Sequence, residues 1–430
     1  MTRDDWTRRE FIGTTAGLTA AALNVPLASA YASGSDILKV GLIGCGGRGT
    51  GAARDCMRSS DGVEIITMGD LFPDRLAQSR EHLGQVIEED PTLAPKFNVT
   101  DELCFTGFDA FRQVLAQDID LVLIATPPTF RPIHVEAAVS AGKHIFMEKP
   151  VAVDPAGVRS IVASSEIASQ NGLGIVAGTQ RRHQLEYLDI MQRIHDGAIG
   201  EVLGAQVYWN QGGLWNKPRE EGWTDVEWQL RNWLYFTWAS GDHIVEQHIH
   251  NLDVANWALN AHPIKAVGLG GRQARTDPAY GHIFDHFAID YEYPNGVHVM
   301  SMCRQIDGSA NHVGEHIVGS NGTSDPGSWI APKNGERYET ERTDINPYVQ
   351  EHTDLIASIR RGTPLNEGRR VAESTLTAIM GREAAYTGGE IVWDELLNAQ
   401  QSLMPENLDF GPLDIPPVPM PGVTVVERNR

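Results

Sequence analysis

The sequence is short of cysteine, of positive charge and of long apolar runs. Four cysteines among 430 residues give no disulfide framework of the kind that stabilises small secreted domains. Lysine and arginine total 35 against 56 acidic residues, and the net charge of −21 disfavours binding to nucleic acid or to anionic lipid surfaces. We find no internal repeat and, apart from a proline-rich end, no low-complexity tract. The remaining composition, 41% hydrophobic and 21% charged, is that of an ordinary globular protein.

The longest apolar stretch lies at the amino terminus, from Phe11 to Leu27. Glycines and threonines dilute it and Pro26 interrupts it, so we expect no membrane-spanning helix or anchor. The segment before it, Thr7-Arg8-Arg9-Glu10-Phe11-Ile12, is a twin-arginine pattern. We predict that residues 1–32 are a Tat signal and that the mature chain is exported or periplasmic. A disordered tail with a chance Arg-Arg pair is the alternative.

A glycine-rich turn follows the first strand-like run of the mature chain. The short apolar run 40–43 is typical of a buried parallel strand. Gly44 would then make the tight turn, Gly46 would let the backbone approach a pyrophosphate, and Gly49 would let helix and strand pack closely. The phosphates would bind the free N–H groups at the start of the helix. We therefore predict a dinucleotide-binding turn made of Gly44, Gly46, Gly47, Arg48 and Gly49.

Two later apolar runs support this interpretation. The run 63–69 ends at Asp70, at about the 20-residue distance where an acid binds ribose hydroxyls. The run 120–126 ends in small and turn residues, and strand and helix patterns alternate over 36–155, as in a doubly wound parallel sheet. Leu71, rather than an arginine, follows Asp70, so we expect NAD rather than NADP. An ordinary α/β turn with a solvated aspartate is the alternative.

A lysine marks the end of another predicted strand. Glu148-Lys149-Pro150 follows the strand pattern 143–147, and ligands bind at the carboxyl ends of such strands. From there Lys149 can reach both a nicotinamide ribose and a substrate hydroxyl, while Pro150 fixes the backbone after it. A surface lysine before a turn is the plain alternative.

The stretch 241–257 has apolar residues at helical spacing. Glu246 and His250 are four residues apart and would share one helix face, with His243 nearby. A carboxylate one turn before an imidazole suits a proton-abstracting histidine that its neighbour orients and keeps basic. The same three side chains could form a metal-binding triad. Because the dinucleotide already supplies an electrophile, we predict no metal. A buried polar helix without chemistry is a further alternative.

The composition changes beyond residue 187. Seven of the ten tryptophans fall between Trp209 and Trp257, strand patterns there alternate, and Pro294-Asn295-Gly296 predicts a hairpin turn. We predict an α/β chain with an N-terminal Rossmann doubly wound parallel sheet and a C-terminal α+β domain with a large open, mostly antiparallel sheet. The predicted boundaries are a signal at 1–32, an NAD-binding domain at 36–180, a second domain at 181–400 and a proline-rich tail at 401–430.

With these motifs together, the chain resembles the glucose–fructose oxidoreductase, inositol dehydrogenase and rhizopine-catabolism family (Gfo/Idh/MocA), nearly end to end over the mature chain. The motifs that carry the resemblance are the glycine turn, Ala125-Thr126-Pro127 with His134, Glu148-Lys149-Pro150, the 246–250 stretch, Glu351-His352 and the segment 381–386. The family usually has Asp in place of Glu246 and Gly in place of His248.

The resemblance implies an oxidoreductase that transfers hydride between a secondary alcohol of a sugar or cyclitol and a tightly bound NAD(P). Lys149 would position the reacting hydroxyl, His250 would remove its proton, and Glu246 would complete the catalytic group. The cofactor contacts implied beyond the glycine turn are Asp70, Ala125, Thr126, Pro127, His134, Glu148 and Lys149. Since an exported enzyme has no ready NAD pool, a second sugar should return the hydride. The family's open sheet also implies a homo-oligomer, a dimer or tetramer.

Aromatic rings and forked donors in the second half suit a polyhydroxylated ring. The predicted substrate-binding residues are Arg181, Arg182, Tyr208, Trp215, Trp233, Tyr235 and His243. An alternative function is a redox-neutral, NAD-assisted glycosidase that oxidises transiently, eliminates the glycosyl group and reduces again. Relatives of that kind tend to lack the lysine of Glu-Lys-Pro. A binding protein without chemistry is a third class, which the presence of Lys149, Glu246 and His250 disfavours.

Overall fold

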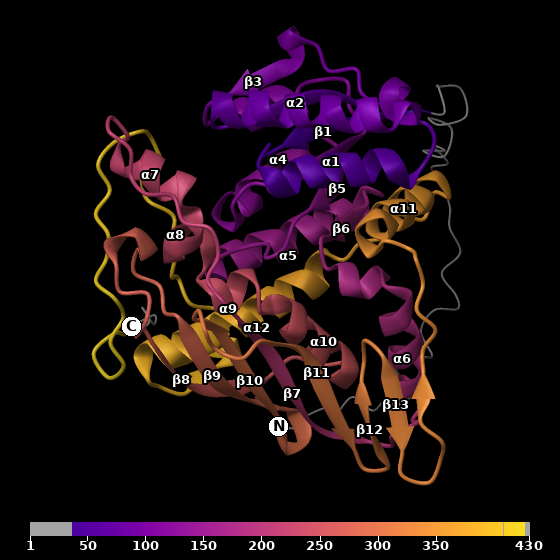
Figure 1. Ribbon diagram of the computed structural model, residues 1–430, viewed down its shortest axis with the longest axis vertical. Coiled ribbons are helices and arrows are strands. Elements are labelled where there is room, and N and C mark those ends of the chain that lie inside the picture. The colour runs from indigo at the N-terminus through magenta and orange to yellow at the C-terminus, as the bar shows by residue number, and fades with distance from the viewer. Residues whose placement is uncertain (1–36, 407, 426–430) are drawn as a thin grey trace, which may run out of the picture. The chain divides into compact units, whose positions relative to one another are not determined.

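The first sheet of the molecule is a six-stranded parallel sheet (Figure 1). The computed structural model describes residues 37–406 and 408–425, so the predicted signal at 1–32 lies outside the described residues. The strand order is β3-β2-β1-β4-β5-β6, and every neighbouring pair is parallel. The strands are β1 (Leu38–Ile43), β2 (Val63–Asp70), β3 (Cys104–Thr106), β4 (Leu121–Ile124), β5 (His144–Met147) and β6 (Ile175–Ala177). The predicted doubly wound sheet is confirmed.

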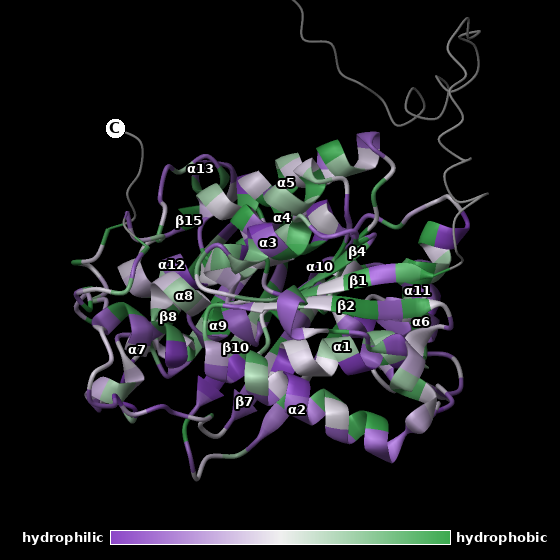
Figure 2. Ribbon diagram, turned by 90° about the horizontal axis from the view of Figure 1, so that it is seen from above, coloured by the Kyte–Doolittle hydropathy of each residue, from purple (hydrophilic) through white to green (hydrophobic). Residues whose placement is uncertain are grey.

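Helices cover both faces of this sheet, which explains why its central strands are continuous apolar runs. All four residues of β4 and of β5 are buried, and β1 and β4 are coloured as apolar in Figure 2. The helices of this part are α1 (Gly47–Ser59), α2 (Pro73–Glu89), α3 (Ala110–Leu115), α4 (Arg131–Ser140) and α5 (Pro155–Gln170). A late helix, α11 (Pro347–Arg360), returns to pack on α1, and its Leu355 and Ile356 join the core of this sheet.

The second sheet has nine strands in the order β14-β13-β12-β11-β7-β10-β9-β8-β15. All its pairs are antiparallel except β7 with β10. The predicted hairpin turn is confirmed, because 294–296 joins two paired strands in which Tyr293 faces Val297. The strands are β7 (Val202–Gln211), β8 (Lys265–Gly271), β9 (His286–Tyr293), β10 (Val297–Gln305), β11 (His312–Gly319), β12 (Gly322–Asp325), β13 (Trp329–Pro332), β14 (Tyr338–Glu339) and β15 (Ile391–Val392).

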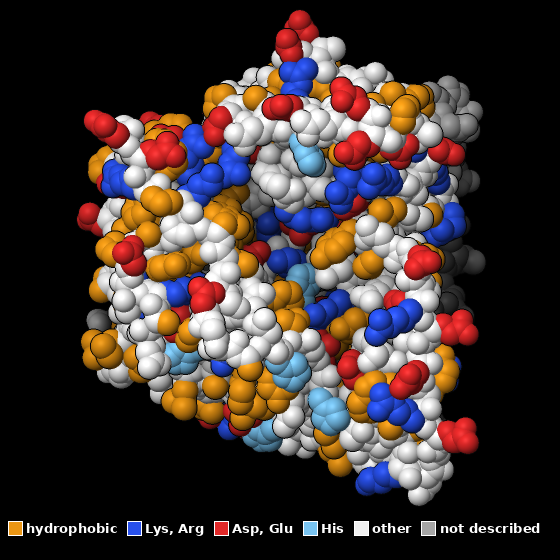
Figure 3. All heavy atoms as spheres, viewed as in Figure 1, with side chains coloured by type: hydrophobic (Ala, Val, Ile, Leu, Met, Phe, Trp, Pro, Cys, Tyr) orange, Lys and Arg blue, Asp and Glu red, His pale blue; other side chains and the backbone are white. Residues whose placement is uncertain are grey.

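One face of the second sheet is covered and the other is open. The remaining helices are α6 (Leu185–His195), α7 (Asp225–Arg231), α8 (Thr237–Ser240), α9 (His243–Glu246), α10 (Ile249–Leu259), α12 (Gly368–Thr387) and α13 (Trp393–Leu397). α10 and α12 pack on one face, so Val299 and Cys303 are buried while Met300 and Met302 between them stay exposed. Hydrophobic and histidine side chains gather over these strands in the lower part of Figure 3.

The carboxyl-terminal tail runs beside α7 and α8 (Figure 1). It packs there with Leu403, Leu408 and Leu413 in a third hydrophobic cluster that also contains Phe72 of the first sheet's rim. Among the described helices, none combines the length and apolar character that a bilayer crossing requires.

Candidate functional site

The turn after β1 leaves room for a ligand at its backbone. Gly44 has φ +95°, and a Cβ there would lie 2.6 Å from the backbone nitrogen of Thr126. A Cβ on Gly49 would lie 1.8 Å from the carbonyl oxygen of Gly44, so neither position admits a side chain. At Gly46 and Gly47 a Cβ would meet no atom within 4 Å, because both face open space at the start of α1. The residues present therefore fit a pyrophosphate.

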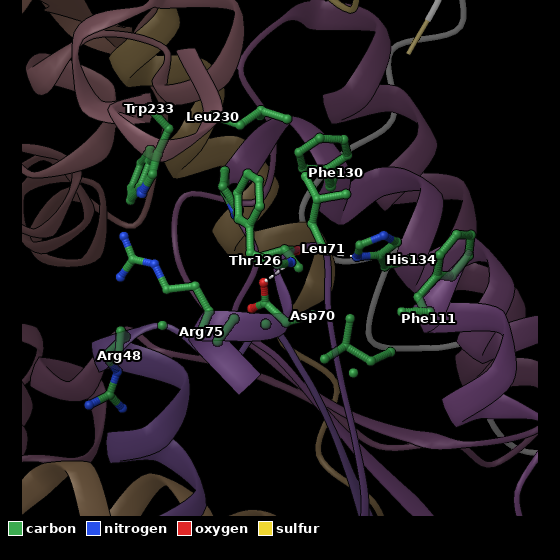
Figure 4. Close-up of a pocket in the computed structure, with 18 of the residues that line it drawn as sticks. Arg48, Asp70, Leu71, Arg75, Phe111, Thr126, Phe130, His134, Leu230 and Trp233 are labelled. Atoms are coloured by element: carbon green, nitrogen blue, oxygen red, sulfur yellow. Dashed lines mark hydrogen bonds between the residues drawn. The ribbon is translucent and has the colours of Figure 1, made fainter. Parts of the chain in front are cut away.

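A cavity of about 450 Å³ lies over this turn (Figure 4). Its lining includes Gly46 after β1, Asp70 at the end of β2, Phe108 after β3 and Thr126 after β4. None of the described residues that line it lies in the loops directly after β5 or β6. In this strand order the first three strands hold the adenosine half of a dinucleotide, whose ribose binds the acid of β2. The cavity is therefore the adenosine half of the site.

Asp70 stabilises the turn while it faces the cavity. Its carboxylate accepts hydrogen bonds from the backbone N–H groups of Cys45 (2.6 Å) and Phe72 (2.8 Å). Burial raises the pKa of Asp70, and these two donors oppose the shift. Arg75, in the first turn of α2, lines the same cavity (Figure 4). This arginine was not predicted, because it lies beyond Leu71 and Phe72, the residues directly after Asp70.

The predicted residues Ala125, Thr126, Pro127 and His134 all line the cavity. His134 Nδ1 lies 3.1 Å from Thr126 Oγ1, and its ring packs against the rings of Phe111 and Phe130. Burial lowers the pKa of His134 to about 3, so the imidazole is neutral at physiological pH. A neutral ring in this place orders the loop after β4 without adding charge to the cavity.

Arg48 and Glu148, both predicted to contact the cofactor, bind each other. The Arg48 guanidinium donates to Glu148 and lies 3.5 Å from Glu351 on α11, so it joins the glycine turn to that helix. Glu148 is buried and does not line the adenosine cavity, so its contact with the cofactor stays a prediction. Burial and the charge of Glu148 raise the pKa of Glu351 well above its usual value. A buried carboxylate needs a partner, which Arg48 supplies to Glu148.

The Lys149 side chain, at the end of β5 in the first sheet, contacts the second half of the chain. Its Nζ donates to the backbone carbonyl oxygen of Glu246 at 2.7 Å and lies 3.1 Å from Glu246 Oε1. Since Lys149 follows β5, beyond the adenosine cavity, this contact lies on the nicotinamide side of the sheet. In the middle of Figure 3 a hollow opens in which side chains coloured as Lys or Arg and as His are visible.

His250 lies in the same neighbourhood, and its environment keeps it neutral. Burial lowers the pKa of His250 well below its usual value, and the charges of Lys149, Arg181 and Arg48 lower it further. Its Nδ1 is buried without a hydrogen-bond partner in the described part of the chain, and the ring stacks on Trp209 at 5.7 Å. The prediction that an adjacent carboxylate keeps His250 basic is therefore wrong.

The cause is a break in the predicted helix. α9 ends at Glu246 and α10 begins at Ile249, so Glu246 and His250 do not share one helix face. Gln247 lies in the break, where its side-chain oxygen accepts hydrogen bonds from Gln211 and Gln305 of the second sheet. Glu246 consequently pairs with Lys149 rather than with His250.

His243, predicted as a substrate contact, is buried and pairs with Asp242. Its Nδ1 lies 2.8 Å from Asp242 Oδ1, and its ring packs against Phe287. Asp242 also accepts hydrogen bonds from the Tyr386 hydroxyl (2.6 Å) and the Phe284 N–H (2.9 Å). Across residues 37–406 and 408–425, no three His, Cys, Asp or Glu side chains are grouped as a metal site.

Three other predicted substrate residues are held in internal contacts. Arg181 pairs with the buried Glu315, although its guanidinium also lies near His250. Arg182 binds Asp253 at 2.7 Å, and the hydroxyl of the fully buried Tyr235 donates to two backbone carbonyls. The clustering of these residue types in the sequence did not reveal that each one has a structural partner.

The last three predicted substrate residues lie elsewhere. Tyr208 is on the open face of the second sheet, where its ring stacks on His312 at 4.4 Å. Trp209, its neighbour in β7, is on the covered face beside His250 and was not predicted. Trp215 and Trp233 line the adenosine cavity instead of the reaction side. Strand alternation could have separated the two faces, but no local signal gives the path of the 212–233 segment.

Two family models match the chain. One, described as the oxidoreductase family with an NAD-binding Rossmann fold (GFO_IDH_MocA), matches residues 38–173. The other, the GFO/IDH/MocA C-terminal domain, matches residues 187–324. Between them, these matches include the glycine turn, Lys149 and His250.

The proteins to which this chain is similar carry different named activities. The 2,7-anhydro-N-acetylneuraminate hydratase of Escherichia coli K12 is 28% identical over 231 residues, 53% of this chain and 56% of that protein. The inositol 2-dehydrogenase of Pseudomonas savastanoi pv. phaseolicola is 26% identical over 264 residues, 61% of this chain and 66% of that protein. The alignments thus cover between half and two thirds of these relatives. The crystal structure of aldose-aldose oxidoreductase from Caulobacter crescentus has a TM-score of 0.65 at 18% identity, covering 83% of this chain and 99% of that one.

Proposed function

Because the chain belongs to the Gfo/Idh/MocA oxidoreductase family, whose Rossmann domain binds NAD, we propose that it oxidises a secondary alcohol of a sugar or cyclitol. The observation that carries this proposal is the meeting of Lys149, from the end of β5, with the 246–250 segment of the second half. The similarity to inositol 2-dehydrogenases supports a polyol as the substrate class. Bound NAD would accept hydride from the substrate carbon.

Lys149, His250 and Trp209 have different roles in the proposed reaction. The Lys149 ammonium, held by Glu246, donates a hydrogen bond to the reacting hydroxyl and stabilises the negative charge that develops on its oxygen. His250 is neutral, so it can accept the hydroxyl proton. Because Nδ1 of His250 is buried, the accepting atom is Nε2. The covered side of β7, with Trp209, supplies an apolar wall beside the imidazole.

A panel of sugars and cyclitols added singly to the purified protein tests this function. We expect at least one polyol to reduce the bound NAD, seen as NADH absorbance. Lys149→Met should lower that rate by about 10²- to 10⁴-fold, while Lys39→Met, which removes an exposed lysine paired with Asp118, should not. Failure of every polyol to reduce the nucleotide would contradict the proposal.

The second candidate is a redox-neutral reaction in which oxidation is transient and a group is eliminated. The similarity to a 2,7-anhydro-N-acetylneuraminate hydratase favours it. The two candidates differ in what happens at the carbon next to the oxidised one, because elimination first removes a proton there. Uptake of solvent deuterium at that carbon, with release of nitrophenol from nitrophenyl glycosides and no net NADH, would favour the second candidate.

We further propose that the protein is exported by the Tat pathway and retains its nucleotide. The twin-arginine pattern at residues 7–12 supports export. A fusion of residues 1–36 to a reporter that works only after Tat export tests the signal. Replacing Arg8 and Arg9 with lysine should abolish export of the reporter.

A further inference from the structure

The outer wall of the adenosine cavity comes from the second half of the chain. Trp215, Lys217, Leu230 and Trp233 line the cavity together with residues of the first sheet. In Figure 4, Trp233 and Leu230 lie on one side of the cavity and Asp70 on the other. The rings of Trp215 and Trp233 meet edge to face, with centroids 6.4 Å apart. The adenosine half is therefore enclosed by a segment that is remote in sequence from the dinucleotide fold.

An ion pair fixes this wall to the rim of the first sheet. The two terminal nitrogens of Arg231, at the end of α7, donate to the two oxygens of Asp74 at 2.9 and 3.0 Å. The guanidinium also lies over the ring of Phe72, 3.9 Å from its centroid. Asp74 and Phe72 both follow Asp70 closely, so the wall is fastened beside the predicted ribose site. Bidentate geometry makes such a pair directional as well as attractive.

Residues 410–413 of the carboxyl-terminal tail pack against the outer side of this wall. The Gly411 carbonyl oxygen accepts a hydrogen bond from Val226 N–H at 3.2 Å, and the Leu413 carbonyl oxygen accepts one from the Gln229 side chain at 2.8 Å. The Phe410 ring lies 6.0 Å from the ring of Phe72 and 5.2 Å from that of Phe108. The tail thus contacts both α7 and the rim of the first sheet.

We propose that residues 214–233 form the outer adenosine subsite and that residues 410–413 lock it, so the dinucleotide leaves only when this contact opens. The Trp215 and Trp233 rings offer apolar surface for an adenine. Lys217 and Arg75 face the same cavity and place positive charge beside a phosphorylated ligand. This inference rests on the nucleotide-binding part of the proposed function and not on the substrate.

Release of nucleotide from the full chain tests the lock. Radiolabelled NAD is loaded, free nucleotide is removed, and loss of label is followed after excess unlabelled NAD is added. Arg231→Gln and Phe410→Ser should each raise the dissociation rate by about ten- to hundredfold. Arg369→Gln, which removes an exposed ion pair with Glu166 of α5 outside residues 214–233 and 410–413, is the control and should match the wild type. Phe410 is 42% exposed, so its replacement carries little risk to folding.

Energy transfer tests the subsite independently of activity. Excitation of tryptophan should produce NADH emission, and Trp233→Phe should reduce it more than Trp329→Phe on β13 does. Equal dissociation rates in the wild type, Arg231→Gln and Phe410→Ser, or equal emission from the two tryptophan variants, would overturn the inference while leaving the proposed function intact. Absence of any nucleotide binding in the wild type would instead overturn the proposed function.

Discussion

At the scale of single residues, Glu246 acts on the lysine and not on the imidazole. Both acceptors of the Lys149 ammonium belong to Glu246, and both side chains are mostly buried. His250 has no carboxylate partner in the described structure and is surrounded by positive charge. The proposed base is therefore neutral because of its surroundings, and the proposed hydroxyl-binding group is held in place by Glu246.

The depressed pKa of His250 predicts an unusual pH profile. A general base works in its neutral form, and His250 stays neutral until the pH falls well below 6.5. The kcat/KM for alcohol oxidation should therefore stay flat between pH 8 and 6. With an ordinary histidine, whose pKa is about 6.5, the neutral fraction would fall to roughly a quarter at pH 6. A fall of that size, if it disappeared in His250→Asn, would show that the imidazole titrates normally.

His183 contributes to stability in a defined pH range. Burial opposes its protonation, but the hydrogen bond to Asp354 (2.6 Å) and the Glu367 carboxylate, 3.4 Å from Nε2, raise its pKa to about 9. Its folded-state pKa thus lies above the unfolded value, so the stabilisation is complete below about pH 6.5 and is lost as the pH rises through 9. We expect His183→Gln to lower the free energy of unfolding by about 2–3 kcal/mol at pH 6. Denaturant titrations that gave the same difference at pH 6 and pH 10 would contradict this account.

At the scale of elements, α11 is joined to the glycine turn through one side chain. Arg48 from the turn lies between Glu148 at the end of β5 and Glu351 on α11, with Asp55 of α1 3.6 Å away. Three buried carboxyl groups therefore share one guanidinium. Burial and the charge of Glu148 raise the pKa of Glu351 well above its usual value, which favours the protonated form of this carboxyl within the cluster.

This arrangement predicts unequal effects of two substitutions. Glu351→Gln should change the free energy of unfolding by less than about 1 kcal/mol at pH 7, because the raised pKa of Glu351 favours the neutral form that Gln mimics. Arg48→Met should cost about 3 kcal/mol, because Glu148 and Asp55 then lose a buried partner. Denaturant unfolding of both variants measures this difference. A larger loss in Glu351→Gln than in Arg48→Met would show that Glu351 is charged.

The sequence predicted those features of the site that neighbouring residues or strand order determine, and it missed those that distant contacts determine. The glycine turn follows from backbone sterics within a few residues, and Asp70 and Lys149 follow from the alignment of parallel strand ends. The break between α9 and α10 was missed because Gln211 and Gln305 hold Gln247 from distant strands. Trp215 and Trp233 were assigned to the substrate for a similar reason, since only the docking of α7 places them over the adenosine half.

At the scale of the whole molecule, one face of the second sheet is left uncovered by the helices of the described chain. Its exposed residues include Leu269 (78% exposed), Val267, Met300 and Met302. An apolar sheet face of this kind marks an interaction site, and we propose that a second copy of the chain covers it. The family resemblance supports the same assignment.

A charge on this face should change the assembly state. Leu269→Lys combined with Met300→Lys should shift the protein from oligomer to monomer in light-scattering chromatography, because lysines would be buried in the contact. Ile167→Lys, at an exposed apolar position on α5, is the control and should leave the mass unchanged. An unchanged oligomer in the double variant would place the contact elsewhere.

The most direct test of the central claim, that Lys149 and His250 act together at the nicotinamide side of the site, is a single-turnover transfer of deuterium. The protein with bound NAD is mixed with a polyol deuterated at each carbinol carbon. The nucleotide is then released, and its mass is measured by mass spectrometry. We expect the nucleotide to gain one deuterium in the wild type and none in Lys149→Met or His250→Asn, with equal nucleotide content in all three. Deuterium transfer at the wild-type rate in either variant would contradict the account.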